Sequence, residues 1–239
     1  MAQGVAWWAR RLGLRCTVVI PDTAPQTKVA AIRRLGAEIV EVAFDDWLEI
    51  FRTHAHEGVE GLFVHAFSDP AVMAGNGTIA LEILEDLPDV DAVVIPYGGG
   101  GLTCGIASAL RALAHGCKVY ACEAATAAPL AASLAAGELT KVDYEPSFVD
   151  GIGAPEVFPE MFELTRNLVD GSLVAGLDEV AAAVRLLAER ARIVAEGAGA
   201  TPVAAALAGK AGGGKVVCVV SGGNIDASKL GAILAGETP

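Results

Sequence analysis

The sequence predicts an α/β protein with parallel sheets and flanking helices. Two observations carry this prediction. Short β-branched runs alternate with stretches of helical period along most of the chain, and two of these runs end in glycine-rich turns. Such alternation is typical of βαβ units, whose right-handed crossovers place the strands in parallel. The composition agrees, because 53% of the 239 residues are hydrophobic and only 5% are aromatic. Aliphatic runs of this kind suit strands that are buried on both faces.

The expected elements follow in order, beginning with a helical pattern directly after Met1. Period and β-branching predict strands at residues 17–20, 38–43, 62–66, 92–96, 118–122 and 215–220. Between them, the apolar period predicts helices over residues 28–35, 71–87, 102–114 and 178–195. The helix over 28–35 precedes Gly36, a typical C-terminal cap.

A domain boundary is expected near Ser68-Asp69-Pro70, where a strand gives way to a long helix. Residues 1–68 would form a small α/β domain, and residues 69–239 a larger one. Residues 138–159 are rich in proline and glycine and are expected to form an irregular excursion over the larger sheet. Irregular segments of this length are usually functional.

Charge and cysteine usage limit the partners and the compartment. The formal net charge is −12, and the charges are interspersed, which argues against nucleic acid and anionic membranes. The five cysteines show no C-x-x-C spacing, and four of them lie in apolar stretches typical of a core. Reduced, buried thiols of a cytoplasmic protein are expected rather than disulfides or zinc ligands. No signal segment follows Met1. The high apolar content leaves surface for a partner subunit, so a homodimer is expected.

Four consecutive glycines, Gly98, Gly99, Gly100 and Gly101, separate a buried strand from an apolar helix that begins with Leu102. Without Cβ atoms, successive backbone N–H groups can turn toward one anion, and the helix adds its free N–H groups and the positive end of its dipole. A mobile linker is the alternative, but linkers do not join a core strand to an apolar helix. The motif lacks the lysine of a nucleotide P-loop and the spacing of a dinucleotide fingerprint. It predicts a phosphate-binding loop.

A second polar glycine turn, Ser221-Gly222-Gly223-Asn224, follows the strand at 215–220. The Ser221 hydroxyl could meet a ring nitrogen or a phosphate, although a serine here is also a common turn former or helix cap. Ligands of open parallel sheets bind outside the carboxyl ends of the strands. Two such turns can therefore face a single ligand.

Two glutamates leave alternatives open. Glu196 begins the run Glu196-Gly197-Ala198-Gly199-Ala200, in front of Pro202, which is expected to open a new helix. It is either a functional carboxylate or a solvated glutamate beside a glycine C-cap. Glu123 lies just past the strand at 118–122, where it could cap the next helix or bind a cation.

In this order, the motifs resemble those of the fold-type II pyridoxal-phosphate enzymes, especially the threonine dehydratase and serine racemase branch. The resemblance covers essentially the whole chain. Its further motifs are Ala2-Gln3-Gly4-Val5-Ala6, Pro21-x-x-Ala24-Pro25-x-x-Lys28-Val29, Leu35-Gly36-Ala37, Ala74-Gly75-Asn76-Gly77-Thr78-Ile79-Ala80-Leu81-Glu82-Ile83 and Asp150-Gly151-Ile152. It implies the two-domain architecture of that family.

The resemblance also implies roles for the two glycine turns. Gly98–Gly101 and the Leu102 amide would hold the phosphate of pyridoxal 5'-phosphate. Ser221 would hydrogen-bond the pyridine nitrogen, with Gly222 among the cofactor-binding residues. The implied activity is that of an ammonia-lyase of the serine/threonine dehydratase type, which converts a small β-hydroxy amino acid to a 2-oxo acid and ammonia. An amino-acid (serine) racemase and a hydroxyaspartate-type dehydratase are the close alternatives.

The chain departs from the family pattern at its front. Family members carry a Ser-x-Gly-Asn-His loop and, further upstream, the lysine to which the cofactor is linked. Met1 stands where the histidine of that loop would be, and none of the lysines present matches the motif. We therefore assign no catalytic residue and expect an N-terminally truncated member of the family. The alternative from another class is a non-catalytic homologue that binds pyridoxal phosphate or phosphate.

A second departure concerns a divalent cation. Some relatives bind one through a glutamate, a backbone carbonyl and an acidic residue. Glu123 matches the first and Ala127 the second, but Pro129 stands where the acid is expected. The missing ligand and charge argue against Mg²⁺ or Ca²⁺ at this position.

Overall fold

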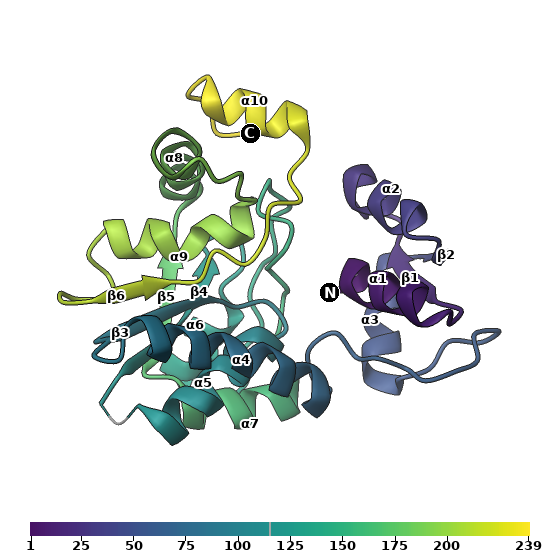
Figure 1. Ribbon diagram of the computed structural model, residues 1–239, viewed down its shortest axis with the longest axis horizontal. Coiled ribbons are helices and arrows are strands. Elements are labelled where there is room, and N and C mark those ends of the chain that lie inside the picture. Colours follow the sequence, from purple (N-terminus) through teal and green to yellow (C-terminus); the bar gives the residue numbers. More distant parts are fainter. Residues whose placement is uncertain (115) are drawn as a thin grey trace. The chain divides into compact units, whose positions relative to one another are not determined.

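The computed structural model describes residues 1–114 and 116–239, which divide into two compact units, Met1–Ala66 and Phe67–Pro239 (Figure 1). The residues at the expected boundary, Ser68 to Pro70, lie just inside the second unit. Each unit has its own parallel sheet and its own buried core.

The first unit is a two-stranded parallel sheet with helices packed on it. Its elements are α1 (Ala2–Leu12), β1 (Thr17–Pro21), α2 (Gln26–Arg34), β2 (Glu38–Val42) and α3 (Phe44–Thr53). Ala6 of α1 and Val29 and Ile32 of α2 are buried against Ile20 of β1. Burial of these aliphatic side chains holds the helices on the sheet.

The strand expected at 62–66 does not form, and this prediction was wrong. Here the chain is irregular, and the aromatic and imidazole rings pack on one another. The ring centroids of Phe51 and His65 lie 5.0 Å apart, and those of His54 and Phe63 lie 5.6 Å apart. The His65 ring is also within 3.2 Å of the Phe51 carbonyl oxygen. Ring contacts thus take the place of strand pairing.

The second unit contains a four-stranded sheet in the order β5-β4-β3-β6, with every pair of neighbours parallel. Its elements are α4 (Pro70–Asp86), β3 (Ala92–Pro96), α5 (Gly101–Leu113), β4 (Lys118–Ala124), α6 (Pro129–Ala136), α7 (Pro159–Leu168), β5 (Gly171–Ala175), α8 (Leu177–Leu186), the π-helical turn η1 (Leu187–Ala191), α9 (Gly197–Leu207), β6 (Val216–Cys218) and α10 (Ala227–Leu234). All five residues of β3 are buried, as expected for a central strand.

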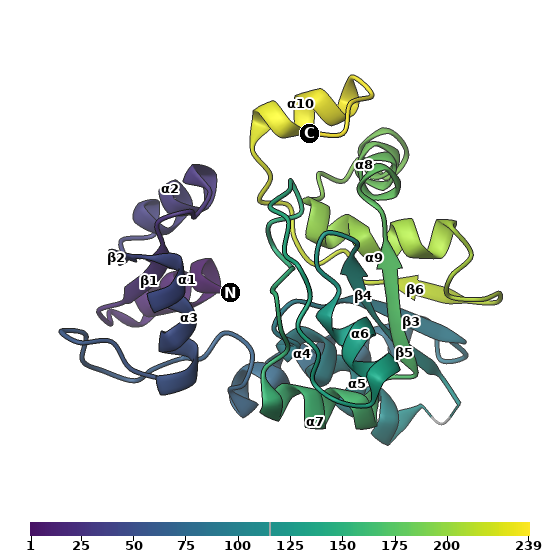
Figure 2. The same cartoon turned by 180° about the vertical axis from the view of Figure 1, so that it is seen from behind.

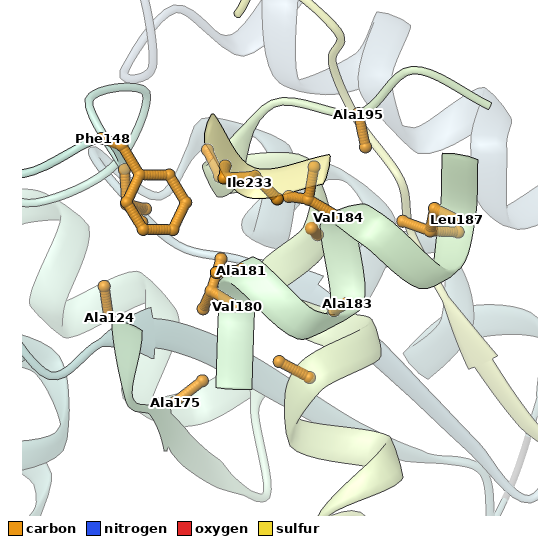
Figure 3. Close-up of a cluster of buried hydrophobic side chains, with 14 of the residues drawn as sticks. Ala124, Phe148, Ala175, Val180, Ala181, Ala183, Val184, Leu187, Ala195 and Ile233 are labelled. Atoms are coloured by element: carbon orange, nitrogen blue, oxygen red, sulfur yellow. The ribbon is translucent and has the colours of Figure 1, made fainter. Parts of the chain in front are cut away.

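Helices cover both faces of this sheet. Helix α9 lies on one face with α8 and α10 outside it, and α4, α5 and α7 cover the other face (Figures 1 and 2). Figure 3 shows the core on the α8 side, where Val180 and Val184 pack near Phe148 and Ile233. Tightly packed helices on both faces leave the strand ends as the place for a ligand.

Three details of the second unit differ from the expectation. Strand β5 is not predicted by the sequence, since its Gly171-Ser172 start is a weak strand signal. The helix expected over 178–195 ends earlier, because η1 widens its last turn and Arg192 takes a left-handed conformation with φ 61°. Pro202 does not open a helix but lies inside α9.

Asp170 joins three donors where β4 begins. Its carboxylate accepts hydrogen bonds from the Val119 amide at 2.8 Å, from Arg111 at 2.6 Å and from Lys118 at 3.0 Å. Partial burial opposes ionisation, but these bonds outweigh it and hold the pKa of Asp170 at about 2. Asp170 therefore ties the end of α7 to the sheet as an anion.

This network predicts acid sensitivity. Because the folded-state pKa of Asp170 lies below the usual value of about 3.9, its stabilisation is present above about pH 4 and is lost as the pH falls toward 2. We expect Asp170→Asn to lower the free energy of unfolding at pH 7 by about 1–2 kcal/mol and to flatten its fall between pH 5 and 3, measured by urea titration. Asn at the exposed Asp143 is the control. If the free energy of unfolding of Asp170→Asn falls between pH 5 and 3 as steeply as that of the wild type, Asp170 does not cause the acid sensitivity.

Among the described residues, no helix combines the length and the apolar character needed to cross a membrane.

Candidate cofactor-binding site

Two neighbouring strands deliver both predicted turns to one edge of the sheet. Strands β3 and β6 run in parallel with Ala92 opposite Val216, and the Val219 amide extends the ladder by donating to the Val94 carbonyl at 3.0 Å. Gly98 comes two residues after β3, and Ser221 two residues after Val219. The sheet therefore brings the two turns out side by side, at the carboxyl edge where ligands bind.

Neighbouring residues pack closely around the four glycines of the loop. A Cβ on Gly99 would overlap the Phe67 ring, and one on Gly101 would lie 2.5 Å from the Phe67 Cα. Gly98 approaches Ile152, whose Cα would be 3.4 Å from such a Cβ. Gly100 has φ +92°, a conformation that only glycine adopts without strain. A side chain at Gly99, Gly100 or Gly101 would therefore meet overlap or backbone strain, and the loop is a packed structural element rather than a mobile linker.

The amide groups of this loop are available to a ligand. In the portion of the chain that the structure describes, no backbone or side-chain acceptor takes a hydrogen bond from the N–H groups of Gly98 to Leu102. Gly101 and Leu102 form the first turn of α5, where the helix dipole favours an anion. Buried or half-buried N–H groups without an acceptor are rare in folded proteins. A phosphate group fits this cradle.

The excursion over residues 138–159 contributes its Asp150-Gly151-Ile152 turn to the same place. Ile152 and the Gly151 carbonyl border Gly98. On its other side, Gly151 faces helix α9, since an added Cβ would be 2.8 Å from the Ala198 Cβ and 3.4 Å from Glu196 Oε1. This turn therefore links the glycine loop to the start of α9.

The first turn of α9 in turn supports Ser221 and Gly222. An added Cβ on Gly199 would lie 2.7 Å from the Gly222 carbonyl oxygen and 3.4 Å from the Ser221 amide nitrogen. The Glu196 amide donates to the Gly222 carbonyl at 2.9 Å, and a Cβ on Gly222 would overlap the Glu196 carboxylate. Glu196 therefore does not lie beside a C-cap, because Gly197 begins α9. Ser221 itself is exposed, with its hydroxyl accessible to a ligand.

Glu123 and Ala127, which match two of the three cation ligands of some relatives, lie at the end of β4 and shortly before α6. The buried Glu123 carboxylate accepts from the Leu130 amide at 2.9 Å, the Ala131 amide at 2.8 Å and the Ser172 hydroxyl at 2.6 Å. Burial raises the pKa of Glu123, and these three donors oppose that rise. Within the described residues, no cluster of His, Cys, Asp or Glu is arranged to hold a metal ion. The contacts are those of a helix cap.

This cap gives a stability prediction. In Glu123→Gln, an amide group replaces one acceptor oxygen and leaves a buried N–H without a partner. We expect the free energy of unfolding at pH 7 to fall by about 1–3 kcal/mol, measured by denaturant titration with and without Mg²⁺. Gln at the exposed Glu138 is the matched control. A stabilisation of the wild type by Mg²⁺ that Glu123→Gln abolishes would instead show that Glu123 binds a cation.

Sequence comparison now identifies the family. Residues 1–222 match the family described as "Pyridoxal-phosphate dependent enzyme", and the chain belongs to this family. The match confirms the resemblance drawn from the motifs and the pyridoxal phosphate cofactor that this resemblance implies. The parallel sheets and flanking helices, which also match solved threonine deaminases, confirm the expected fold class.

The relatives are lyases and racemases that act on amino acids. An L-threonine ammonia-lyase of Thermotoga maritima is 41% identical over 98% of this chain, which spans 59% of that relative's length. The processed form of threonine deaminase isoform 2 from Solanum lycopersicum has a TM-score of 0.84 and 34% identity, with 98% of this chain and 71% of that chain covered. Maize serine racemase has the same TM-score at 28% identity, with 98% and 74% covered.

Sequence reasoning did not find two of the residues that shape the glycine loop. Phe67 packs on Gly99 and Gly101, and Tyr97 lies beside Gly100. Phe67 lies about thirty residues before the loop, so nothing local connects the two. Tyr97 could have been noticed in the sequence, because a tyrosine directly follows a fully apolar strand. The sequence does not show, however, that its side chain points toward Gly100.

Proposed function

We propose that the second unit binds pyridoxal 5'-phosphate, with the phosphate on the amides of Gly98–Leu102 and the ring beside Ser221. The observation that carries this proposal is the row of loop amides without a protein acceptor at the start of α5. Membership in the family supports the identity of the anion. Gly222 belongs to the site as a close-packed part of the Ser221 turn.

The chain's own residues would bind and orient the cofactor. The loop amides and the positive end of the α5 dipole would bind the phosphate and offset part of its negative charge without a lysine. The Ser221 hydroxyl would donate a hydrogen bond to the ring nitrogen, which favours the nitrogen without a formal charge. Pyridoxal phosphate, when bound, supplies the electron sink that stabilises a carbanion at the α-carbon of an amino acid. The exposed position of Ser221 is compatible with entry of the ring from solvent.

The reaction we propose for the protein is ammonia-lyase chemistry on a small β-hydroxy amino acid, yielding a 2-oxo acid and ammonia. The L-threonine ammonia-lyase of Thermotoga maritima, aligned with nearly all of this chain, supports this choice. No residue of this chain is assigned the proton-transfer step. Serine racemase chemistry is the nearest alternative, because maize serine racemase shares the fold at 28% identity.

A binding experiment tests the first part of the proposal. The purified chain is titrated with pyridoxal phosphate, followed by its visible absorption, and then with inorganic phosphate as a competitor. Saturable binding that phosphate displaces supports the site, and no binding overturns it. Intact mass after borohydride treatment then shows whether a lysine of this chain is modified. A fixed adduct on one lysine would contradict the non-catalytic alternative.

An activity assay tests the second part. The chain is incubated with pyridoxal phosphate and L-threonine, L-serine or 3-hydroxyaspartate, and 2-oxo acid and the chirality of the remaining substrate are measured. Formation of 2-oxo acid supports the lyase proposal. Loss of chirality without 2-oxo acid would favour the racemase. Cofactor binding with neither product would favour the non-catalytic homologue.

We also propose a homodimer in the cytoplasm. Exposed aliphatic side chains gather in and around η1 and α8, where Leu186, Ile193 and Val194 are each at least 40% exposed. Such residues are candidates for burial against a second copy. All five cysteines are free thiols, as is usual in a reducing compartment; Cys104, Cys117 and Cys122 are buried as expected, whereas Cys16 and Cys218 are only partly buried. Sedimentation equilibrium tests the dimer, and a monomer at every concentration tested would overturn it.

A further inference from the structure

The phenol of Tyr97 lies beneath the glycine loop. Tyr97 follows β3, its side chain is 1% exposed, and its amide donates to the Cys122 carbonyl at 2.8 Å. The position of a Cβ on Gly100 is 3.0 Å from the Tyr97 hydroxyl oxygen and 3.1 Å from its Cε2 atom. Met161 Cε, also at 3.1 Å, closes the same space. The phenol therefore fills the volume directly under the residue with positive φ.

A small buried polar cluster holds the phenol in place. Its hydroxyl oxygen lies 3.4 Å from Thr165 Oγ1, a long polar contact, and Thr165 Oγ1 lies 3.2 Å from Cys104 Sγ. Cys104 also connects the cluster to the glycine loop, because its amide donates to the Gly100 carbonyl at 2.8 Å. Thr165 comes from α7 and Cys104 from α5. Gly100 is therefore fixed from below by Tyr97 and through its own carbonyl by Cys104.

The cluster is uncharged at physiological pH. Burial raises the pKa of Tyr97 far above its usual value, and burial also raises the pKa of Cys104. Both groups consequently keep their protons. A neutral phenol and a neutral thiol place no negative charge beneath an anion-binding loop, where a phenolate or thiolate would repel a phosphate.

We propose that Tyr97 is a positioning residue for the phosphate-binding loop. Its hydroxyl supports Gly100 from below and so fixes the direction in which the amides of Gly100–Leu102 point toward the phosphate. A phenylalanine would fill most of the same volume but would leave a gap of one oxygen atom beneath Gly100. It would also remove one polar partner of Thr165. This inference rests on the proposed phosphate site.

Tyr97→Phe tests it in the full chain. We expect the Kd for pyridoxal phosphate to rise about three- to tenfold, because the space left by the phenol oxygen lets Gly100 move and shifts the loop amides away from the phosphate. The ¹H–¹⁵N shifts of the Gly100–Leu102 amides on saturation with inorganic phosphate are expected to shrink. Tyr120→Phe, on the neighbouring strand β4, removes a phenol oxygen away from the loop and is the matched control. It should leave both readouts unchanged.

Thr165→Val separates positioning from stability. This variant removes the partner of the phenol but leaves the phenol under Gly100, so we expect a lower melting temperature with less than a twofold change in Kd. Equal weakening of binding by Tyr97→Phe and Thr165→Val would overturn the proposal, as would unchanged binding in Tyr97→Phe. A wild type that binds neither pyridoxal phosphate nor phosphate would overturn the proposed function, and this inference with it.

Discussion

Gly100→Asp is expected to abolish binding of pyridoxal phosphate, with a Kd at least about a hundredfold above that of the wild type. Three effects act together. The new Cβ would lie 3.0 Å from the Tyr97 hydroxyl oxygen and 3.1 Å from Met161 Cε, the backbone would have to keep φ +92° with a side chain attached, and a carboxylate would be forced into the buried space beneath the loop amides. Displacement of the loop and repulsion between the carboxylate and the phosphate together need to cost only about 3 kcal/mol for a hundredfold loss of affinity.

The control for this experiment is Gly212→Asp. Gly212 also has a positive φ, of +81°, but nothing lies within 4 Å of its added Cβ. It therefore reproduces the backbone strain and the added charge without the site. Absorption titration with pyridoxal phosphate measures both variants, and circular dichroism shows that they are folded. Wild-type affinity in a folded Gly100→Asp variant would show that the phosphate binds elsewhere.

Gly199→Ala is expected to have the second-largest effect, although Gly199 is not one of the proposed cofactor-binding residues. The added methyl group would lie 2.7 Å from the Gly222 carbonyl oxygen and 3.1 Å from its amide nitrogen, and backbone atoms cannot turn aside. The Ser221 turn must then move, or α9 must. We expect a destabilisation of about 1–3 kcal/mol and a Kd for pyridoxal phosphate raised at least about tenfold.

Gly75→Ala is the matched control, since Gly75 is also helical and has open space at its Cβ. That change should stabilise the protein by a few tenths of a kcal/mol to about 1 kcal/mol, because alanine favours a helix. Calorimetry and cofactor titration on both variants measure the two effects. If Gly199→Ala binds the cofactor as tightly as Gly75→Ala does, the first turn of α9 does not position Ser221.

The sequence predicts the fold class and the two glycine turns because their signals are local. The strand that ends at Pro96 is wholly apolar, and a run of glycines before a helix has few other physical explanations. The contacts among the turns are not local. Nothing in the sequence places Phe67 on Gly99 or Glu196 against Gly222, because these pairs are far apart along the chain and meet only when the parallel sheet has formed.

The role of Glu123 shows a different limit of sequence reasoning. A carboxylate past the end of a strand suits a cation and a helix cap equally well, since both need its oxygen atoms. In the structure the amides of Leu130 and Ala131 donate to this carboxylate, and their direction depends on how the chain turns from β4 into α6, which no local pattern predicts. Ring contacts likewise replace the strand expected at 62–66, and such packing has no periodic signature.

Gly197 and Gly199, at the start of α9, pack against two different segments of the chain. A Cβ on Gly197 would meet Val149 and Phe148, and one on Gly199 would meet the Ser221–Gly222 peptide. The first turn of α9 therefore connects the Phe148–Val149 segment to the Ser221–Gly222 turn. A ligand that immobilises one of these segments should also slow the local unfolding of the other. Amide hydrogen exchange at Val149 and Gly222 should consequently slow together when the cofactor binds, even though only the second residue belongs to the Ser221 turn.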